Sequence, residues 1–203
     1  MSLRQPNPID LFLGETTSGE YSRDERALLI GLAHESILAA LEHREIPLDP
    51  PTPHLSEPRG VFTSLYLHAQ LRGCVGYVLP IGPVYRTVAE TARAAAFEDT
   101  RFYPLKLAEA PDLQIELSIL SVPKAIASDA IEVGRHGLLI SMGGRRGLLL
   151  PQVPLEHHWD RETFLGQTCQ KAGLPRDAWK HGACIEAFTA EVFGEKSEPH
   201  RKD

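Results

Sequence analysis

Apolar residues recur along this chain with two different spacings, which predict a mixture of helices and strands. Between Ile30 and Leu41 they lie three or four positions apart, as on one face of a helix. Residues 22–25 read Ser-Arg-Asp-Glu, a capping-box pattern that predicts the start of this helix. A second helix is predicted to follow Pro83, and a third to run from Asp160 to the stop signal at Gly173.

Strict alternation of apolar and polar residues predicts strands elsewhere. Residues 113–119 alternate and predict a strand with one apolar face. Two hairpins are predicted, the first joining residues 60–67 to 70–75, and the second joining residues 137–141 to 147–150. A closing strand is predicted over residues 183–193, with its inner face formed by Cys184, Phe188, Ala190 and Val192.

Helices and hairpins are mixed without a regular strand–helix–strand repeat, which favours an α+β fold with antiparallel sheets. Several prolines fall within residues 47–58, so an extended surface connection is predicted there. This segment and the turn at 122–130 are the two candidates for a boundary between lobes. The residues before Glu20 are expected to be a poorly ordered lead-in.

Composition narrows the class of protein. A chain of 203 residues with 42% hydrophobic and 24% charged residues matches a globular domain. No apolar run approaches the roughly 20 residues of a membrane span, and no secretory signal begins the chain. The three cysteines have no short pairing, which is typical of a reducing compartment and predicts a cytoplasmic protein. The net charge of −6 opposes broad binding to nucleic acid.

No metal site or cofactor is expected from the motifs. Adjacent histidines such as His157 and His158 point apart on regular structure, and no zinc-binding spacing of histidines or cysteines occurs. Residues 143–147 are glycine-rich and basic, yet they match neither a Walker loop nor a dinucleotide-binding fingerprint. A hairpin turn explains these glycines without a ligand.

Residues 71–76 read Leu-Arg-Gly-Cys-Val-Gly and form the strongest candidate for chemistry. Arg72 stays protonated, so it favours a thiolate at Cys74 if the two side chains approach each other. Gly73 and Gly76 allow another backbone or a ligand to come close. The sequence leaves two interpretations open: a reactive nucleophilic or redox thiol, or a buried and inert cysteine.

Other polar residues are candidates for a substrate-binding site around this motif, and each also has a structural interpretation. Asp99 and Arg101 would pair with each other across a turn after the second helix. Glu116 and Ser118 would lie on the solvent-facing side of the alternating strand. His136 and Gln152 would hydrogen-bond local backbone. Together with Gly73 and Gly76, the candidates are Asp99, Arg101, Glu116, Ser118, His136 and Gln152.

Six ordered blocks of this sequence resemble the AMMECR domain family, in particular its bacterial and archaeal members called AmmeMemoRadiSam system protein A. The resemblance covers about residues 22–194, with small departures at Val75 and Thr100, where isoleucine and proline are usual in the family. The blocks are residues 71–76, 97–105, 115–120, 134–138, 149–154 and 171–174.

The resemblance implies one domain spanning residues 1–203, with a core at about 22–194 and two lobes. The larger lobe would hold both termini on an antiparallel sheet, and a smaller inserted lobe would carry a second sheet. The cysteine motif would lie at their junction, in an interlobe cleft. The family's activity is not settled, so the resemblance gives a context without a reaction.

Three functions follow as hypotheses. In the first, the chain belongs to a modification system with Memo-like and radical S-adenosylmethionine proteins, and Cys74, assisted by Arg72, acts on a small or macromolecular substrate. In the second, it is a non-catalytic adaptor that docks a partner. In the third, it is a regulator that binds nucleic acid, although its acidic net charge opposes such binding.

Overall fold

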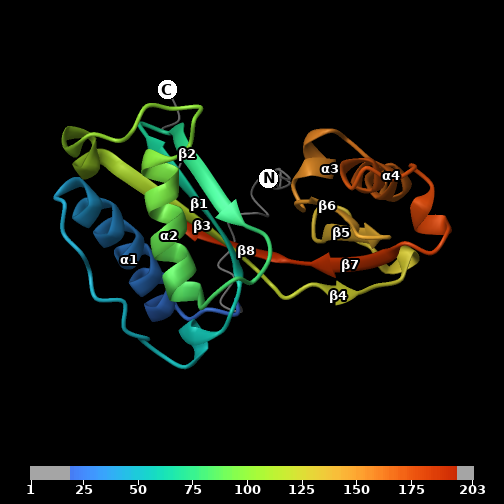
Figure 1. Cartoon of the computed structure of the whole chain (residues 1–203), viewed down its shortest axis with the longest axis horizontal. Coiled ribbons are helices and arrows are strands. Elements are labelled where there is room, and N and C mark those ends of the chain that lie inside the picture. The colour runs from blue at the N-terminus through green and yellow to red at the C-terminus, as the bar shows by residue number, and fades with distance from the viewer. Residues whose placement is uncertain (1–18, 196–203) are drawn as a thin grey trace, which may run out of the picture.

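The computed structural model describes residues 19–195, which form two lobes of unequal size (Figure 1). The larger lobe contains α1 (Arg23–Leu41), η2 (His54–Ser56), β1 (Gly60–Leu67), β2 (Gln70–Tyr77), α2 (Val84–Phe97), η3 (Leu107–Asp112), β3 (Leu113–Leu120) and β8 (Ala190–Gly194). The smaller lobe contains β4 (Lys124–Ala125), η4 (Ser128–Ala130), β5 (Gly137–Met142), β6 (Arg145–Leu149), α3 (Val153–Glu156), α4 (Arg161–Lys171), η5 (Ala178–Lys180) and β7 (Cys184–Phe188).

Each lobe is built on one antiparallel sheet, which confirms the predicted α+β class. The strand order is β2-β1-β3-β8 in the larger lobe and β4-β7-β5-β6 in the smaller lobe. The predicted lead-in before Glu20 lies almost wholly outside the described residues. The helix predicted after residues 22–25 is present as α1, because the Ser22 side chain accepts from the Glu25 N–H and the Glu25 carboxylate accepts from the Ser22 N–H.

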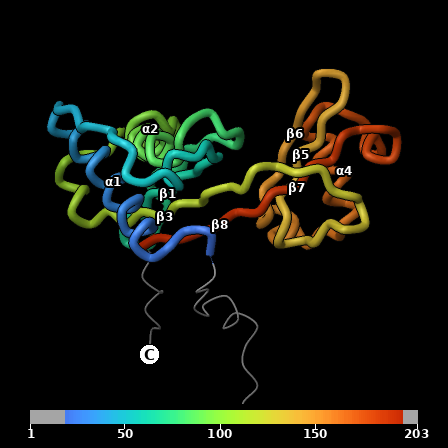
Figure 2. Tube along the Cα trace, turned by 90° about the horizontal axis from the view of Figure 1, so that it is seen from below, coloured from blue at the N-terminus to red at the C-terminus, as the bar shows by residue number. Residues whose placement is uncertain are grey.

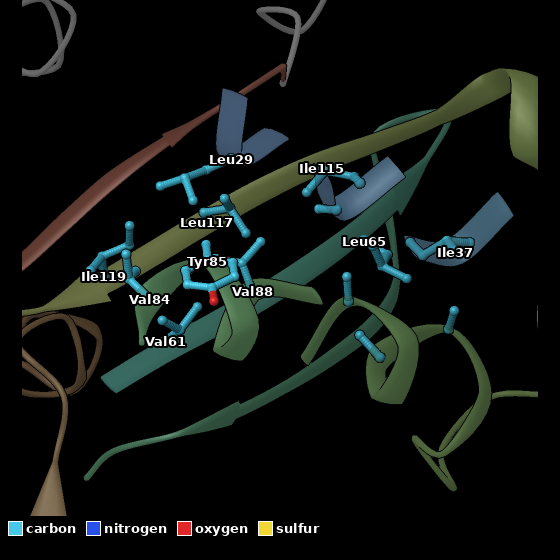
Figure 3. Close-up of a cluster of buried hydrophobic side chains, with 14 of the residues drawn as sticks. Leu29, Ile37, Val61, Leu65, Val84, Tyr85, Val88, Ile115, Leu117 and Ile119 are labelled. Atoms are coloured by element: carbon cyan, nitrogen blue, oxygen red, sulfur yellow. The ribbon is translucent and has the colours of Figure 1, made fainter. Parts of the chain in front are cut away.

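The core of the larger lobe lies between one face of its sheet and the two long helices (Figure 3). Alternate residues of β1 and β3, such as Leu65 and Leu117, point toward α1 and α2 and are fully buried. Leu29 of α1 and Val88 of α2 meet them from the helices. The intervening residues of β1 and β3 therefore lie on the opposite face, which neither helix covers.

Two crossing segments join the lobes, one from β3 to β4 and the other from β7 to β8 (Figure 2). They run side by side, since the Ser121 N–H donates to the Thr189 carbonyl over 2.9 Å and the Thr189 N–H donates to Ser121 Oγ over 3.0 Å. The smaller lobe is thus inserted in the sequence between two strands of the larger sheet.

The single closing strand predicted over residues 183–193 is wrong, because the chain changes sheet at Thr189. β7 belongs to the smaller sheet, and β8 belongs to the larger one. The change shifts the alternation, so that Phe193 packs toward the larger core while Val192 is 54% exposed. Cys184 at the start of β7 is also exposed.

The proline-rich segment at 47–58 is not a boundary between lobes. It wraps the larger lobe and places Leu55 fully buried in its core. The segment also contains the short η2 helix, and Pro58 forms an isolated bridge with Pro83. The other candidate, residues 122–130, begins within the first crossing segment and enters β4.

Replacing Ala69 with glycine should raise the free energy of unfolding by about 0.5–1 kcal/mol. The two-residue turn between β1 and β2 holds His68 and Ala69 at φ values of 50° and 63°, where a side chain is disfavoured. The turn between β5 and β6 uses Gly143 at φ 56° instead. The reverse change, Gly143→Ala, should lower stability by a similar amount. Urea denaturation measures both, and a loss of stability in Ala69→Gly would contradict the prediction.

Candidate functional site

Cys74 lies in the middle of β2, an edge strand of the larger sheet, and pairs in register with Ser64 of β1. The Cys74 N–H donates to Asp99 Oδ2 over 2.8 Å, and Arg101 Nη2 donates to the Cys74 carbonyl over 3.3 Å. Both backbone groups therefore point away from β1, and Ser64 and Cys74 form a non-hydrogen-bonded pair. Such pairs bring side chains close, and Ser64 Oγ donates to Cys74 Sγ over 3.3 Å.

The row of side chains continues across the sheet on the face that α1 and α2 leave open. Ser64 pairs in register with Glu116 of β3. Tyr66, two residues further along β1, donates its hydroxyl to Glu116 Oε1 over 3.3 Å. Burial and the negative charge of Glu116 raise the pKa of Tyr66, so this hydroxyl stays protonated at neutral pH. A half-buried thiol, two hydroxyls and a carboxylate thus share one surface.

Asp99 and Arg101 secure the edge of β2 at the cysteine. The Asp99 side chain is only 6% exposed and accepts hydrogen bonds from the Cys74 N–H and the Arg101 guanidinium. The bonds from Arg101 and the Cys74 N–H outweigh burial and hold the pKa of Asp99 well below its usual range. The two residues pair with each other, as their structural interpretation predicts, and they also contact the Cys74 backbone.

Arg72 lies at an irregularity in β2 and forms an ion pair with a carboxylate of η3. Leu65 pairs with Gly73 and Tyr66 with Leu71, so Arg72 is the extra residue of a bulge. Its guanidinium binds Glu109 through two hydrogen bonds of 3.0 and 3.2 Å, which lower the pKa of Glu109 despite burial. Residues two positions apart share a face only in a regular strand, so the bulge removes the simple reason for Arg72 and Cys74 to lie on the same face.

At Gly73 and Gly76, the space that a side chain would occupy is filled by other atoms of the protein and not left for a ligand. A Cβ on Gly73 would lie 2.1 Å from the Ala95 carbonyl oxygen, so this glycine lets α2 approach β2. A Cβ on Gly76 would lie 2.4 Å from the ring of Phe62 on the neighbouring strand. The close approach predicted for these glycines is therefore accounted for by packing.

Two of the other candidates belong to the smaller lobe. His136 Nδ1 accepts from the Glu132 N–H over 3.0 Å within its own turn, and Gln152 is exposed at the start of α3. His136 also lines a hollow of about 420 Å³ together with Arg59 and residues from both crossing segments. Cys74 is not among the residues that line this hollow.

The cysteine site is built by the larger lobe. Ser64, Asp99 and Arg101, which contact Cys74, all belong to that lobe. β2 ends on the side of the larger lobe that faces the smaller one (Figure 1). Ser118 lies one row beyond Glu116 on the open face, opposite Phe62 and Val192 in register.

Sequence reasoning missed three residues of this site. Ser64 and Tyr66 lie at alternate positions of β1. This alternation indicates a polar face, but only after the face of the strand that meets the core is known. Glu109, the partner of Arg72, gave no signal because the contact spans 37 positions of sequence.

Within residues 19–195, no three His, Cys, Asp or Glu side chains are grouped so that they could hold a metal ion. None of the helices in this range has the length and apolar character needed to cross a membrane. In the basic segment 143–147, Arg145 donates to the Gly173 carbonyl, and Arg135 in the same lobe pairs with Glu132.

Native alkylation should separate the three free cysteines. Cys169 is fully buried, and burial raises its pKa, so we expect it to resist iodoacetamide until the protein unfolds. Cys184 is exposed and should label at the rate of an ordinary thiol, instead of lying in a core as the sequence predicts. Mass spectrometry of peptides after timed alkylation measures both rates. Equal labelling of Cys169 and Cys184 in the folded protein would contradict this burial pattern.

These features define a two-lobed α+β protein. A half-buried cysteine, fixed by hydrogen bonds to its backbone and its sulfur, lies on the open face of the larger sheet. The chain belongs to the AMMECR1 family, whose model matches residues 30–193. That match contains Cys74 and each of its contacts described above.

Relatives of known sequence or structure support this membership. Protein MK0488 of Methanopyrus kandleri is 43% identical over 188 residues, covering 87% of this chain and 90% of its own length. A protein of Aquifex aeolicus is 40% identical over 178 residues, covering 83% of this chain and 91% of its own length. The crystal structure of the uncharacterized protein PH0010 from Pyrococcus horikoshii is similar, with a TM-score of 0.69 and 40% identity over 83% of this chain and 90% of that one.

Proposed function

We propose that this protein is a component of a modification system and that the Cys74 thiol is its functional group. One observation carries the proposal: separate segments fix this cysteine while its side chain stays on an open face. Asp99 and Arg101 hold its backbone from one side, and Ser64 donates to its sulfur from the other. The backbone contacts fix the position of the residue, and the Ser64 contact involves the thiol itself, which a cysteine that only fills space does not need.

The chemistry best suited to this surface is attack by a thiolate on an electrophilic carbon, in which an S–C bond forms and the bond from that carbon to its leaving group breaks, the leaving group taking the electron pair. The Ser64 hydroxyl stabilises negative charge on Sγ because it already donates to that atom. Glu116 supplies a carboxylate in the same row of the sheet, where it can accept a proton. Arg101, whose charge is balanced by Asp99, donates to the Cys74 carbonyl and fixes the strand edge.

The proposed partners are Memo-like and radical S-adenosylmethionine proteins, with a small or macromolecular substrate. The resemblance of the six sequence blocks to the AmmeMemoRadiSam type supports this context, since that type is named for the association. A cytoplasmic location is proposed with it, supported by three cysteines that are all free.

The decisive variant is Cys74→Ser. If the thiol acts, the change should abolish the activity of the set reconstituted with its partners, because a serine hydroxyl gives no thiolate near neutral pH. Thermal stability and partner binding should stay close to wild type, since Cys74 is only half-buried. Full activity in this variant would instead favour the adaptor hypothesis.

Ser64→Ala tests the thiol without knowledge of the substrate. Loss of one hydrogen bond to a charged sulfur should slow alkylation of Cys74 at pH 7 by about tenfold, equivalent to about 1.4 kcal/mol. Ser118→Ala, one row away on the same face, is the matched control and should leave the rate unchanged. An unchanged rate in Ser64→Ala would show that this contact does not activate the thiol.

A further inference from the structure

The segment that follows α2 forms a second surface beside the cysteine strand. A hollow of about 1000 Å³ opens there, lined by Arg72, residues 101–106 and Glu109. This segment lies between α2 and β3, in the yellow-green part of the chain (Figure 1). We propose that it is a docking surface for a peptide segment of a protein partner, in which acidic residues alternate with aromatic or aliphatic ones. The proposal does not depend on the chemistry of Cys74.

Large apolar side chains are exposed around this hollow. Tyr103 is 88% exposed, and Leu107, in the following η3 helix, is 56% exposed. Phe102 is partly buried beneath the Arg101 guanidinium, 5.5 Å from its ring centre. Clustered exposed apolar side chains mark interaction sites on folded proteins, whereas scattered single ones do not.

Backbone hydrogen bonds on both sides of Tyr103 fix the loop that exposes its side chain. On one side, the Phe102 N–H donates to the Asp99 carbonyl over 3.0 Å. On the other side, the Leu105 N–H donates to the Ala96 carbonyl over 2.9 Å, and the Leu105 side chain is buried. A loop already fixed in this way loses little conformational entropy when a partner binds, which favours recognition.

Charge selects the partner. Arg72 forms an ion pair with Glu109 and Arg101 forms one with Asp99. Within residues 19–195 Lys106 forms no ion pair, and it attracts the Glu109 carboxylate only at longer range. Three cations and a single carboxylate, Glu109, thus line the hollow beside its apolar side chains, in a chain of net charge −6. A peptide carboxylate next to an aromatic residue complements this arrangement. A nucleic acid is less suited, because its affinity depends on neutralising many phosphates.

Fluorescence anisotropy with labelled nine-residue peptides tests the proposal on the full chain. The probe carries two glutamates, one tryptophan and one leucine separated by glycines. One control peptide has glutamines in place of the glutamates, and a second has serines in place of the tryptophan and leucine. A labelled deoxythymidine oligonucleotide represents nucleic acid. The probe should bind with a dissociation constant below about 100 μM, and both control peptides should bind at least tenfold more weakly.

Variants of the chain locate the surface. Tyr103→Ser and Lys106→Glu should each weaken probe binding at least fivefold. Their matched controls are Leu155→Ser, an exposed apolar residue of α3, and Lys124→Glu, an exposed lysine of β4. Both controls should bind within twofold of wild type. Cys74→Ser should also bind normally, so failure of the thiol hypothesis would leave this result unaffected.

Four results would overturn the proposal, three from the probes and one from the variants. The first is no binding of the probe at 1 mM peptide, and the second is equal binding of the probe and the two control peptides. The third is tighter binding of the oligonucleotide than of the probe, which would assign the surface to nucleic acid. Equal losses in the paired variants, such as Tyr103→Ser and Leu155→Ser, would likewise remove the surface from the binding site.

Discussion

Replacing Gly73 with valine should lower the free energy of unfolding by about 3 kcal/mol or more, and the melting temperature by about 6–12 °C. The new Cβ would lie 2.1 Å from the Ala95 carbonyl oxygen, a backbone atom of α2. That atom cannot move without shifting the helix, and neighbouring Ala92 and Val88 are fully buried in the core. Thermal and urea denaturation of the two proteins measure the loss.

The expected loss of stability in Gly73→Val is informative because strand propensity alone predicts a gain. Valine is favoured over glycine in strands, so β2 considered alone would gain stability. Gly31→Ala is the control: no atom lies within 4 Å of the added Cβ in α1, and stability should rise by about 0.5–1 kcal/mol. A Gly73→Val protein as stable as wild type would mean that α2 does not pack against this strand as described.

Asp99→Ala should cost about 3 kcal/mol of stability at pH 7, because hydrogen bonds to a charged acceptor contribute about 1.5–3 kcal/mol each. The change leaves the Cys74 N–H and the Arg101 guanidinium without their acceptor. It should also loosen the Cys74 backbone and speed hydrogen exchange at its amide. The exposed Asp112→Ala, in η3, is the control and should change stability by less than about 0.5 kcal/mol.

The pH dependence of this contribution has a definite sign. The pKa of Asp99 is lowered in the folded protein, so its contribution is fully present above the unfolded pKa of about 3.9. It is lost progressively as the pH falls through the folded pKa. The stability difference between wild type and Asp99→Asn should therefore be constant from pH 5 to 7 and shrink below about pH 4. A difference that grows on acidification would contradict this assignment.

Periodicity in the sequence was sufficient for most elements of the fold. Three sequence signals each match one element. The capping box at 22–25 begins α1, the alternation at 113–119 is β3, and the glycine turn before Arg145 joins β5 to β6. These signals work because capping, strand alternation and left-handed turns depend on residues close together in the chain. The cysteine motif could also be singled out, since its glycines and arginine are adjacent in sequence.

Long-range contacts decided the rest. Residues 183–193 look like one strand because alternation carries no information about which sheet receives them, and only pairing assigns β7 and β8 to different lobes. Likewise, the sequence could not show that Arg72 is the extra residue of a bulge and that it pairs with Glu109, 37 positions away. The sequence by itself determined most of the elements and singled out Cys74 as the candidate residue. Tertiary structure alone chose the residues around that thiol, because its partners come from two segments that are distant from it in sequence, β1 and the loop after α2.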